Sequence, residues 1–256
     1  MAECTHGRFV LGLGVAPQEW NVNWHGLHYR NPVKRMREYI QCIRGMWSAT
    51  AEHPLNYEGE YFRIKNYARF IPPPYRHIPI HLGAVLPAMI RLAGSDADGM
   101  IINTLNTPKY ITEIVHPNLK QGMRMAGRSA DSFELSAIKC CAINRNAKEA
   151  RDLGRHIVAF YATLPYFDAV FDPMGFTEQK NMIRAAMNTD RGGMLSAVTD
   201  EMVETLMLAG TVDDVHRQLK AFDGLFETTL LFCPFFGVEP SETRANHLAM
   251  IEAFAQ

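Results

Sequence analysis

The sequence predicts an α/β fold. Short runs rich in apolar and β-branched residues alternate with longer helical patterns along the 256 residues, which is typical of βαβ units around a parallel sheet. The composition is that of a globular chain, 47% hydrophobic and 21% charged, and this length can bury a sizeable core. On pattern alone, a barrel and a doubly wound sheet fit equally well.

Five segments have the composition of strands. The longest, Glu134–Ile143, is apolar enough to be buried on both faces. Pro72–Pro74 imposes an extended backbone before another, and Tyr57–Ile64 is expected to form a hairpin that turns at Gly59. The predicted strands are Phe9–Leu11, Ile78–Leu82, Gly99–Asn103, Glu134–Ile143 and Thr229–Cys233.

The clearest helix follows Asn31, which can cap it, with Pro32 in the first turn where proline is tolerated. Its apolar stripe recurs at steps of three and four residues: Val33, Met36, Ile40, Ile43 and Trp47. Charged residues off that stripe are expected to form a solvated face: Lys34, Arg35, Arg37 and Glu38. Thr211 and Asp214 match the start of a later helix. Other helical patterns cover 88–93, 108–125, much of 147–208, and 242–254.

The charge balance argues against nucleic acid and membrane partners. The formal net charge is -1 and the pI about 6.8, so no global field attracts a polyanion. No apolar run approaches the ~20 residues of a membrane helix. The five cysteines have no CxxC spacing and the N-terminus has no apolar leader, which favours free thiols in the cytoplasm. His25 and His28 lack a third ligand at a zinc-site spacing, so no metal is expected.

Several motifs together resemble one family. Gly7–Gly14 reads Gly-Arg-Phe-Val-Leu-Gly-Leu-Gly, as does a barrel strand of luciferase-like monooxygenases. The likeness continues, in order and spacing, through Trp24–Gly26, Pro32–Tyr39, Tyr57–Phe62, Pro79–Ala84, Leu92–Gly94, Ala97–Gly99 with Asn103, and Leu208–Asp214. Phe160–Tyr161, Pro165–Tyr166 and Gly175–Phe176 are similar to its F420-dependent subgroup.

The resemblance implies a (β/α)8 TIM barrel of the luciferase-like type, here incomplete. About five βα units would match strands 4 to 8, within a single domain spanning residues 1–256, without the three strands that precede this point in the family. Two associations would then complete the fold, a homodimer or a second chain that supplies the remainder.

Barrel active sites form at the carboxyl ends of strands, and the sequence offers candidate cofactor contacts there. Glycines at Gly12 and Gly14 would let the backbone approach a flat ring, although a tight turn explains them equally. Gly83, Ala84 and Val85 precede a helix whose first amides could receive phosphate oxygens, although Pro87 removes one donor. The side chains of Asn103 and Thr104 could hydrogen-bond a ring edge, or simply stabilise a turn.

The loop after the first strand holds the candidates for chemistry. His25 could transfer protons near neutral pH, and Trp24 and His28 could wall a substrate pocket; packing and loop stabilisation are the alternatives. Some deazaflavin relatives use a glutamate as an acid shortly after the glycine pair, and Glu19 is the displaced candidate here.

The leading hypothesis is an oxidoreductase that uses coenzyme F420 and transfers hydride to or from a small organic substrate. An FMN-dependent monooxygenase is one alternative, because nothing in the sequence distinguishes the two ring systems. A non-catalytic fragment or partner subunit of such an enzyme is the other.

Overall fold

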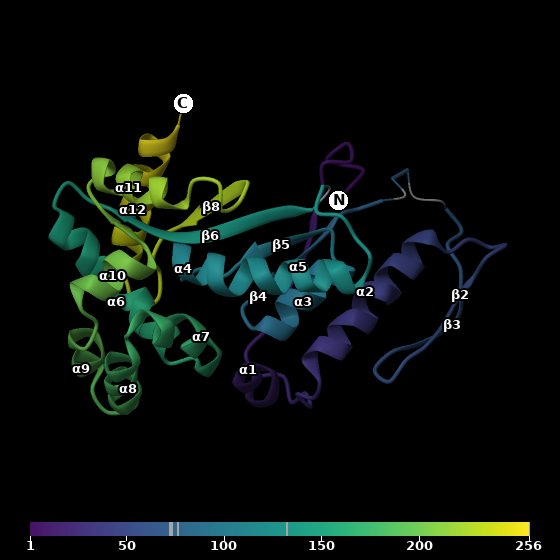
Figure 1. Ribbon diagram of the computed structural model, residues 1–256, viewed down its shortest axis with the longest axis horizontal. Helices are drawn as coiled ribbons and strands as arrows, with labels where there is room; N and C mark the ends of the chain where they lie inside the picture. The colour runs from purple at the N-terminus through teal and green to yellow at the C-terminus, as the bar shows by residue number, and fades with distance from the viewer. Residues whose placement is uncertain (72–73, 76, 132, 256) are drawn as a thin grey trace. The chain divides into compact units, whose positions relative to one another are not determined.

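The computed structural model describes residues 1–71, 74–75, 77–131 and 133–255 (Figure 1). Two of the three prolines of Pro72–Pro74 lie outside the described residues. The chain divides into two compact units. Unit 1 comprises Met1–Met100 and Asn118–Glu134, and unit 2 comprises Ile101–Pro117 and Leu135–Gln256. A single domain over 1–256 stays a prediction, and each unit is described by itself.

Parallel strands form the centre of unit 1. Strand β1 (Leu11–Leu13) pairs in parallel with β4 (Ile80–Ala84), with Leu11 opposite Ile80. Strand β5 (Gly99–Ile102) is the next neighbour of β4, as the sequence predicts. Both β1 and β4 begin two residues later than expected. Pro79 offers a reason for β4, because it has no N–H to donate and contributes only its carbonyl, to the Leu11 amide.

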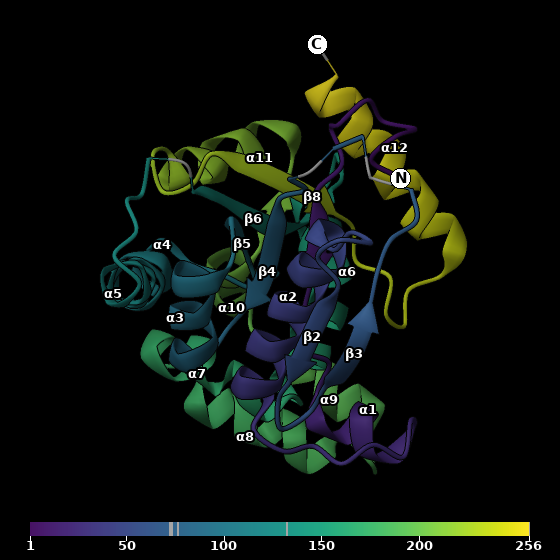
Figure 2. The same ribbon diagram turned by 90° about the vertical axis from the view of Figure 1, so that its right-hand side faces the viewer.

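The hairpin and the first long helix of unit 1 are confirmed. Strands β2 (Leu55–Glu58) and β3 (Arg63–Tyr67) pair antiparallel, and Figure 2 shows helix α2 (Pro32–Ser48) beside them. The cap of α2 was predicted wrongly in one respect. Asn31 stands at the N-cap in a left-handed conformation (φ 44°, ψ 59°), and its side chain makes no capping hydrogen bond. Pro32 begins the helix, as expected.

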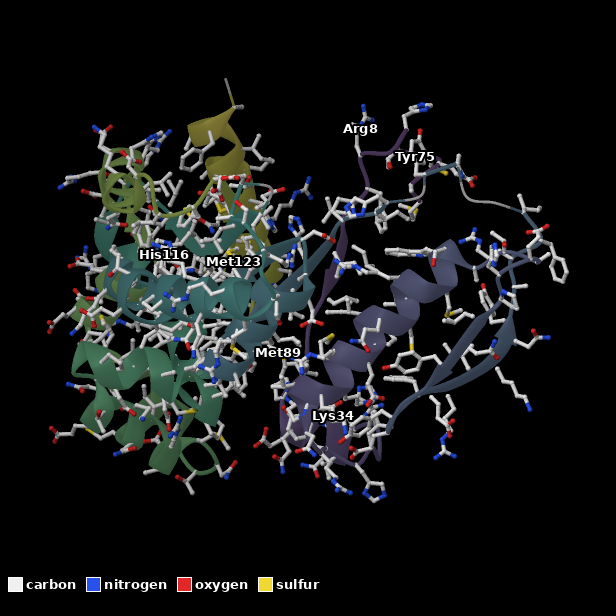
Figure 3. All side chains as sticks on the ribbon, turned by 45° about the vertical axis from the view of Figure 1, so that its right-hand side comes forward. Arg8, Lys34, Tyr75, Met89, His116 and Met123 are labelled. Carbon is white, nitrogen blue, oxygen red and sulfur yellow. The ribbon has the colours of Figure 1, made fainter. Side chains whose placement is uncertain are left out.

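Close helix packing in unit 1 depends on two glycines. Helix α3 (Pro87–Asp96) meets α5 (His116–Met125), and Met89 and Met123 mark the two helices in Figure 3. A Cβ at Gly94 would collide with the Leu119 carbonyl, and one at Gly122 with the Arg91 carbonyl. The predicted helix over 108–125 is confirmed as α4 (Pro108–Tyr110), a π turn (Ile111–Val115) and α5, of which the part up to Pro117 belongs to unit 2. Pro117, which cannot donate a helical hydrogen bond, offers a reason for the π turn.

Strand β6 (Glu134–Ile143) is the centre of unit 2. Its first residue, Glu134, belongs to unit 1, and the rest of the strand belongs to unit 2. Strand β6 pairs in parallel with β7 (Leu208–Gly210) and with β8 (Thr228–Phe232). Strand β7 was not predicted, because Leu-Ala-Gly contains no β-branched or aromatic residue. Strand β6 matches its predicted bounds, and β8 begins one residue early.

Helices fill the rest of unit 2, as the sequence predicts. Helix α11 (Val212–Leu219) starts with the expected capping box, in which Thr211 and Asp214 exchange hydrogen bonds. Helix α12 starts two residues before its predicted position. The longer ones are α6 (Ala147–Ala162), α8 (Thr177–Ala186) and α12 (Pro240–Phe254). The shorter ones are α7 (Asp168–Phe171), α9 (Arg191–Ser196) and α10 (Asp200–Leu206), and unit 1 has one more short helix, α1 (Gln18–Asn23).

Candidate active site

Two strand ends of unit 1 bring most of the predicted cofactor residues to one edge. Gly12 lies within β1 and Gly14 follows it, whereas Gly83 and Ala84 end β4 and Val85 follows. Because β1 and β4 are parallel and in register, with Leu13 opposite Leu82, their carboxyl ends meet at the same edge. The structure therefore gathers these five residues as the sequence implies.

The glycine at the end of β1 is not required by the fold. Gly14 does not have a left-handed backbone, and a Cβ added there would find open space. A Cβ at Gly83 would meet the Leu13 carbonyl at 3.5 Å, an ordinary contact. Neither the backbone conformation nor the packing requires glycine at these two positions. The backbone there has no side chain and is accessible to a flat ligand. This open strand edge fits a flavin-type ring.

A cavity of about 440 Å³ opens directly after β1, and we call it the β1-end cavity. Its lining includes Gly14, His25, Tyr29, Arg35, Tyr39 and Phe62. The Tyr39 and Phe62 rings lie 5.6 Å apart and form one wall. Of the loop candidates, His25 thus faces the same space as the strand-end glycine.

The other loop candidates lie differently. Trp24 is 66% exposed and stacks on Trp20, with ring centroids 4.7 Å apart. His28 is exposed, and neither it nor Trp24 belongs to the cavity lining. Glu19 is on helix α1, near enough to the cavity residue Tyr29 to act on it. Burial first, and then the Glu19 carboxylate, raises the pKa of Tyr29. The hydroxyl of Tyr29 therefore stays protonated at neutral pH.

Sequence reasoning missed Arg35, Tyr29 and Tyr39. Arg35 was assigned to a solvated face, yet it is half-buried and lines the cavity. A signal for this was present, because Pro32, Arg35, Met36 and Tyr39 recur at helical spacing and all four line the cavity.

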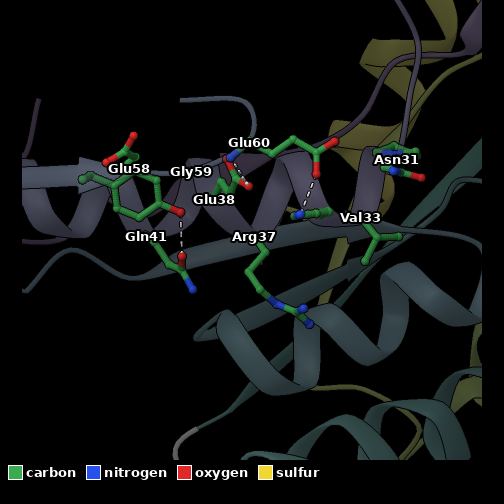
Figure 4. Close-up of a pocket in the computed structure, with 11 residues that line it drawn as sticks. Asn31, Val33, Arg37, Glu38, Gln41, Glu58, Gly59 and Glu60 are labelled. Carbon is green, nitrogen blue, oxygen red and sulfur yellow. Dashed lines mark hydrogen bonds and ion pairs between the residues drawn. The ribbon is translucent and has the colours of Figure 1, made fainter. Parts of the chain in front are cut away.

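The opposite side of α2 forms a larger groove of about 740 Å³ with the hairpin, which we call the α2–hairpin groove (Figure 4). Both of its cationic side chains are paired with carboxylates. Lys34 Nζ lies 2.5 Å from Glu60 Oε2, and Arg37 Nε lies 3.3 Å from Asp96 Oδ2. The Tyr57 hydroxyl donates to Gln41 at 2.9 Å.

Glu38 corrects the expectation of a solvated charged face. It is 6% exposed, and its carboxylate accepts the backbone N–H groups of residues 60, 61 and 62. Burial alone would raise the pKa of Glu38, but these hydrogen bonds outweigh it and the pKa is lowered. Gly59 is needed for the same reason: a Cβ there would collide with the Glu38 carboxylate. The groove is a closed structural network.

The remaining predicted cofactor residues belong to unit 2. Both side-chain amide atoms of Asn103 are buried, and among the described residues neither makes a hydrogen bond of good geometry. The amide lies near enough to the Tyr110 hydroxyl to counteract part of the rise that burial causes in the pKa of Tyr110. The Thr104 hydroxyl is 3.3 Å from the Tyr161 hydroxyl. Tyr161 in turn lies in an aromatic cluster with Phe160, whose ring stacks on Phe236 at 3.8 Å. An unsatisfied buried amide is costly, and a ligand that pairs with it would remove that cost.

The described residues contain no group of three or more His, Cys, Asp or Glu side chains placed to hold a metal ion. Their helices include none long and apolar enough to cross a membrane.

Parallel strands that end at an accessible cavity define an α/β protein of the type that binds small molecules at the carboxyl ends of its strands. Comparison with known proteins identifies the family. Residues 1–228 match the family model of the luciferase-like monooxygenases, so the chain belongs to that family.

Individual relatives agree with this assignment. A 5,10-methylenetetrahydromethanopterin reductase of Archaeoglobus fulgidus is 33% identical over 224 residues, which are 85% of this chain and 64% of the relative. The chain thus spans less than two thirds of that relative's length.

Solved structures confirm the fold class. The coenzyme F420-dependent tetrahydromethanopterin reductase of Methanopyrus kandleri has a TM-score of 0.78 at 23% identity, covering 95% of this chain and 73% of the reductase. A type II Baeyer–Villiger monooxygenase of Pseudomonas putida, in complex with FMN, has a TM-score of 0.62 at 17% identity, covering 98% and 71%. The expected α/β fold class of the luciferase-like barrel type is therefore confirmed, and the match of five βα units to strands 4 to 8 stays a prediction.

Proposed function

We propose that this chain is an F420-dependent oxidoreductase that transfers hydride between the deazaflavin and a small organic substrate. Membership of the family, together with the similarity to the reductases of Archaeoglobus and Methanopyrus, supports this proposal. The observation that carries it is the strand end at Gly14, where neither the backbone conformation nor packing requires the glycine.

The cofactor supplies hydride transfer when bound, and the chain supplies position. In unit 1, Gly12, Gly14 and the segment Gly83–Val85 would hold the ring against the open strand edge. His25, at the cavity wall, is the proposed proton-transfer group, because an imidazole exchanges protons near neutral pH. Glu19 is proposed to assist through Tyr29, whose hydroxyl remains a hydrogen-bond donor.

The other predicted contacts with cofactor or substrate also remain proposals, each supported by a single observation. In unit 2, Asn103 is proposed as a cofactor contact because its buried amide makes no well-formed hydrogen bond among the described residues, with the Thr104 hydroxyl beside it in sequence. Trp24 and His28 remain proposed substrate contacts on the loop. Trp24 and His28 are both exposed, and Trp24 stacks on Trp20. These features favour a role at the rim of the loop.

The FMN-dependent monooxygenase remains the second candidate, favoured by the structural similarity to an FMN complex. A non-catalytic fragment or partner subunit is the third. Titration of the purified chain with F420 and with FMN, followed by cofactor fluorescence, separates them. We expect saturable F420 binding and FMN binding at least roughly tenfold weaker, a difference of about 1.4 kcal/mol. Tight FMN binding without F420 binding would favour the monooxygenase, and binding of neither would favour the non-catalytic protein.

We also propose that the chain associates, as a homodimer or with a second chain that completes the fold. Each unit has an apolar strand with exposed side chains: Val10, next to β1, is 39% exposed, and Leu230 in β8 is 45% exposed. Apolar edge strands favour pairing with another chain. Light scattering tests this, and a monodisperse monomer would contradict it. A cytoplasmic location is proposed from the five cysteines, all of them free.

A further inference from the structure

The β1-end cavity contains an arginine with no ionic partner. Arg35 is half-buried and lines the cavity, and its guanidinium makes no ion pair or hydrogen bond among the described residues. Its two basic neighbours on α2 differ, because Lys34 is paired with Glu60 and Arg37 with Asp96. Arg35 is therefore the unpaired cation of this helix start.

None of the other polar groups that line the cavity provides a negative charge to balance that of Arg35. Arg30 also lines it, but lies 4.0 Å from Glu60. The Asn21 amide donates to the carbonyls of Ala16 and Pro17, at 2.8 and 2.9 Å. Glu19 acts on Tyr29, and no aspartate or glutamate belongs to the described lining. The described lining therefore contains two arginines and no carboxylate, so the cavity wall carries net positive charge.

The remaining wall is apolar and aromatic. Tyr39 and Phe62 form one side, and Met36 and Leu27 also contribute. A pocket with apolar walls and one directional charged group orients an amphipathic ligand, and about 440 Å³ is within the range of small-molecule sites. A guanidinium that loses hydration without gaining a partner is unfavourable, and its planar fork matches a carboxylate or phosphate.

We propose that the β1-end cavity binds the substrate as an organic anion, with its carboxylate or phosphate on Arg35 and its flat apolar body against Tyr39 and Phe62. This inference rests on the proposed function, in which the cavity beside Gly14 receives the substrate. It assigns the chemical class of substrate and names Arg35 as the residue that selects it.

The test uses the whole chain without cofactor and two probes of matched shape, benzoate and benzyl alcohol, measured by calorimetric titration. Arg35→Gln removes the charge, Arg35→Lys keeps it without the fork, and Arg37→Gln is the matched control on the opposite face of the helix. We expect benzoate to bind at least tenfold more tightly than benzyl alcohol. Arg35→Gln should abolish that preference, Arg35→Lys should retain part of it, and Arg37→Gln should leave it unchanged. The Arg35 variants should melt within about 2 °C of the parent, because no partner of Arg35 is lost. Arg37→Gln loses its ion pair with Asp96, but a partly exposed pair contributes little, so its melting temperature should fall by no more than a few degrees.

Three outcomes would overturn the proposal: equal binding of the two probes, an unchanged preference in Arg35→Gln, or an equal loss in Arg37→Gln. The anion that binds Arg35 could instead be the acidic tail of F420. A titration of the variants with F420 distinguishes this tail from a substrate anion. We expect F420 affinity to stay within twofold in Arg35→Gln and benzoate to bind the F420-loaded chain. A tenfold loss of F420 affinity, with F420 displacing benzoate, would assign Arg35 to the cofactor and reject a substrate anion. Benzoate selectivity without any F420 binding would instead reject the proposed function and leave the anion site standing.

Discussion

The two faces of helix α2 carry similar side chains but have different environments. Toward the hairpin, Lys34, Arg37 and Glu38 are each engaged by a partner from another element. Toward the β1-end cavity, the Arg35 guanidinium has no partner among the described residues and lines the same space as the Tyr39 and Phe62 rings. The larger concavity is the structural one and the smaller is the candidate site. Charge content and volume alone would have selected the wrong face, whereas the pairing of each charge separates them.

The same contrast holds for the glycines of the two concavities. Gly59 in the groove is required by the Glu38 carboxylate, which occupies the position of a Cβ. Gly14 in the cavity has open space at that position. A glycine that the fold requires indicates close packing. A glycine that the fold does not require indicates open space that a ligand can occupy.

The largest expected effect is on cofactor binding. Gly14→Val should weaken F420 binding roughly 100-fold, because a branched side chain at an open strand end would clash with a ring held there at a cost of about 1–3 kcal/mol. The melting temperature should stay within about 2 °C, since nothing lies within 4 Å of the added Cβ. Fluorescence titration and thermal unfolding measure the two quantities. Unchanged F420 affinity would remove Gly14 from the site.

Gly59→Ala should give the opposite result. Its Cβ would also lie 2.8 Å from the Tyr57 ring, so the turn must shift and the melting temperature should fall by about 5 °C. F420 affinity should remain within twofold of the parent, because the groove has no role in binding. A stable variant with weakened cofactor binding would reverse the assignment of the two concavities.

Glu38→Gln should destabilise the chain in a manner that depends on pH. The pKa of Glu38 is lowered in the folded state, so the ionised carboxylate contributes stability above the ordinary value of 4.5, and this is lost as the pH falls through the folded pKa. The variant should therefore melt several degrees below the parent at pH 7, with the gap closing below pH 4.5. Thermal unfolding curves of both proteins between pH 7 and pH 4 measure this difference in melting temperature. A gap of constant size would show that ionisation is not the cause.

The smallest effect is expected for Lys34→Gln. The Lys34–Glu60 ion pair is at the surface, with side chains 53% and 36% exposed, and such pairs contribute little. Melting temperature should change by less than about 2 °C and F420 affinity not at all. A larger loss would mean that the groove depends on its exposed pairs as well as on Glu38.

Local patterns predicted much of the fold. Helix α2, the hairpin, strand β6 and the capping box at Thr211 were found because each is encoded by neighbouring residues. Strand β7 was missed, since its pairing with β6 comes from residues far away in sequence. The cap at Asn31 failed for a local reason, because its left-handed backbone does not aim the side chain at the helix amides.

The candidate site was less predictable. Strand-end glycines could be found from their position, and His25 from its loop. Arg35 and Glu38 could not be told apart in the sequence, where both are charged residues of one helix. Their difference arises from tertiary contacts, because the hairpin turn folds onto Glu38, whereas no described carboxylate lines the cavity beside Arg35. Whether a charge is paired is a property of elements distant in sequence.

Hydrogen–deuterium exchange of the chain with and without F420 tests the central claim most directly. The account predicts slower exchange on F420 addition in the segments around Gly14 and Gly83–Val85, and no change in the hairpin turn at residues 58–62. FMN at the same concentration should give weaker protection of the same segments. Protection confined to the hairpin turn, or absent from both strand ends while F420 binds, would contradict the assignment of the β1-end cavity as the site.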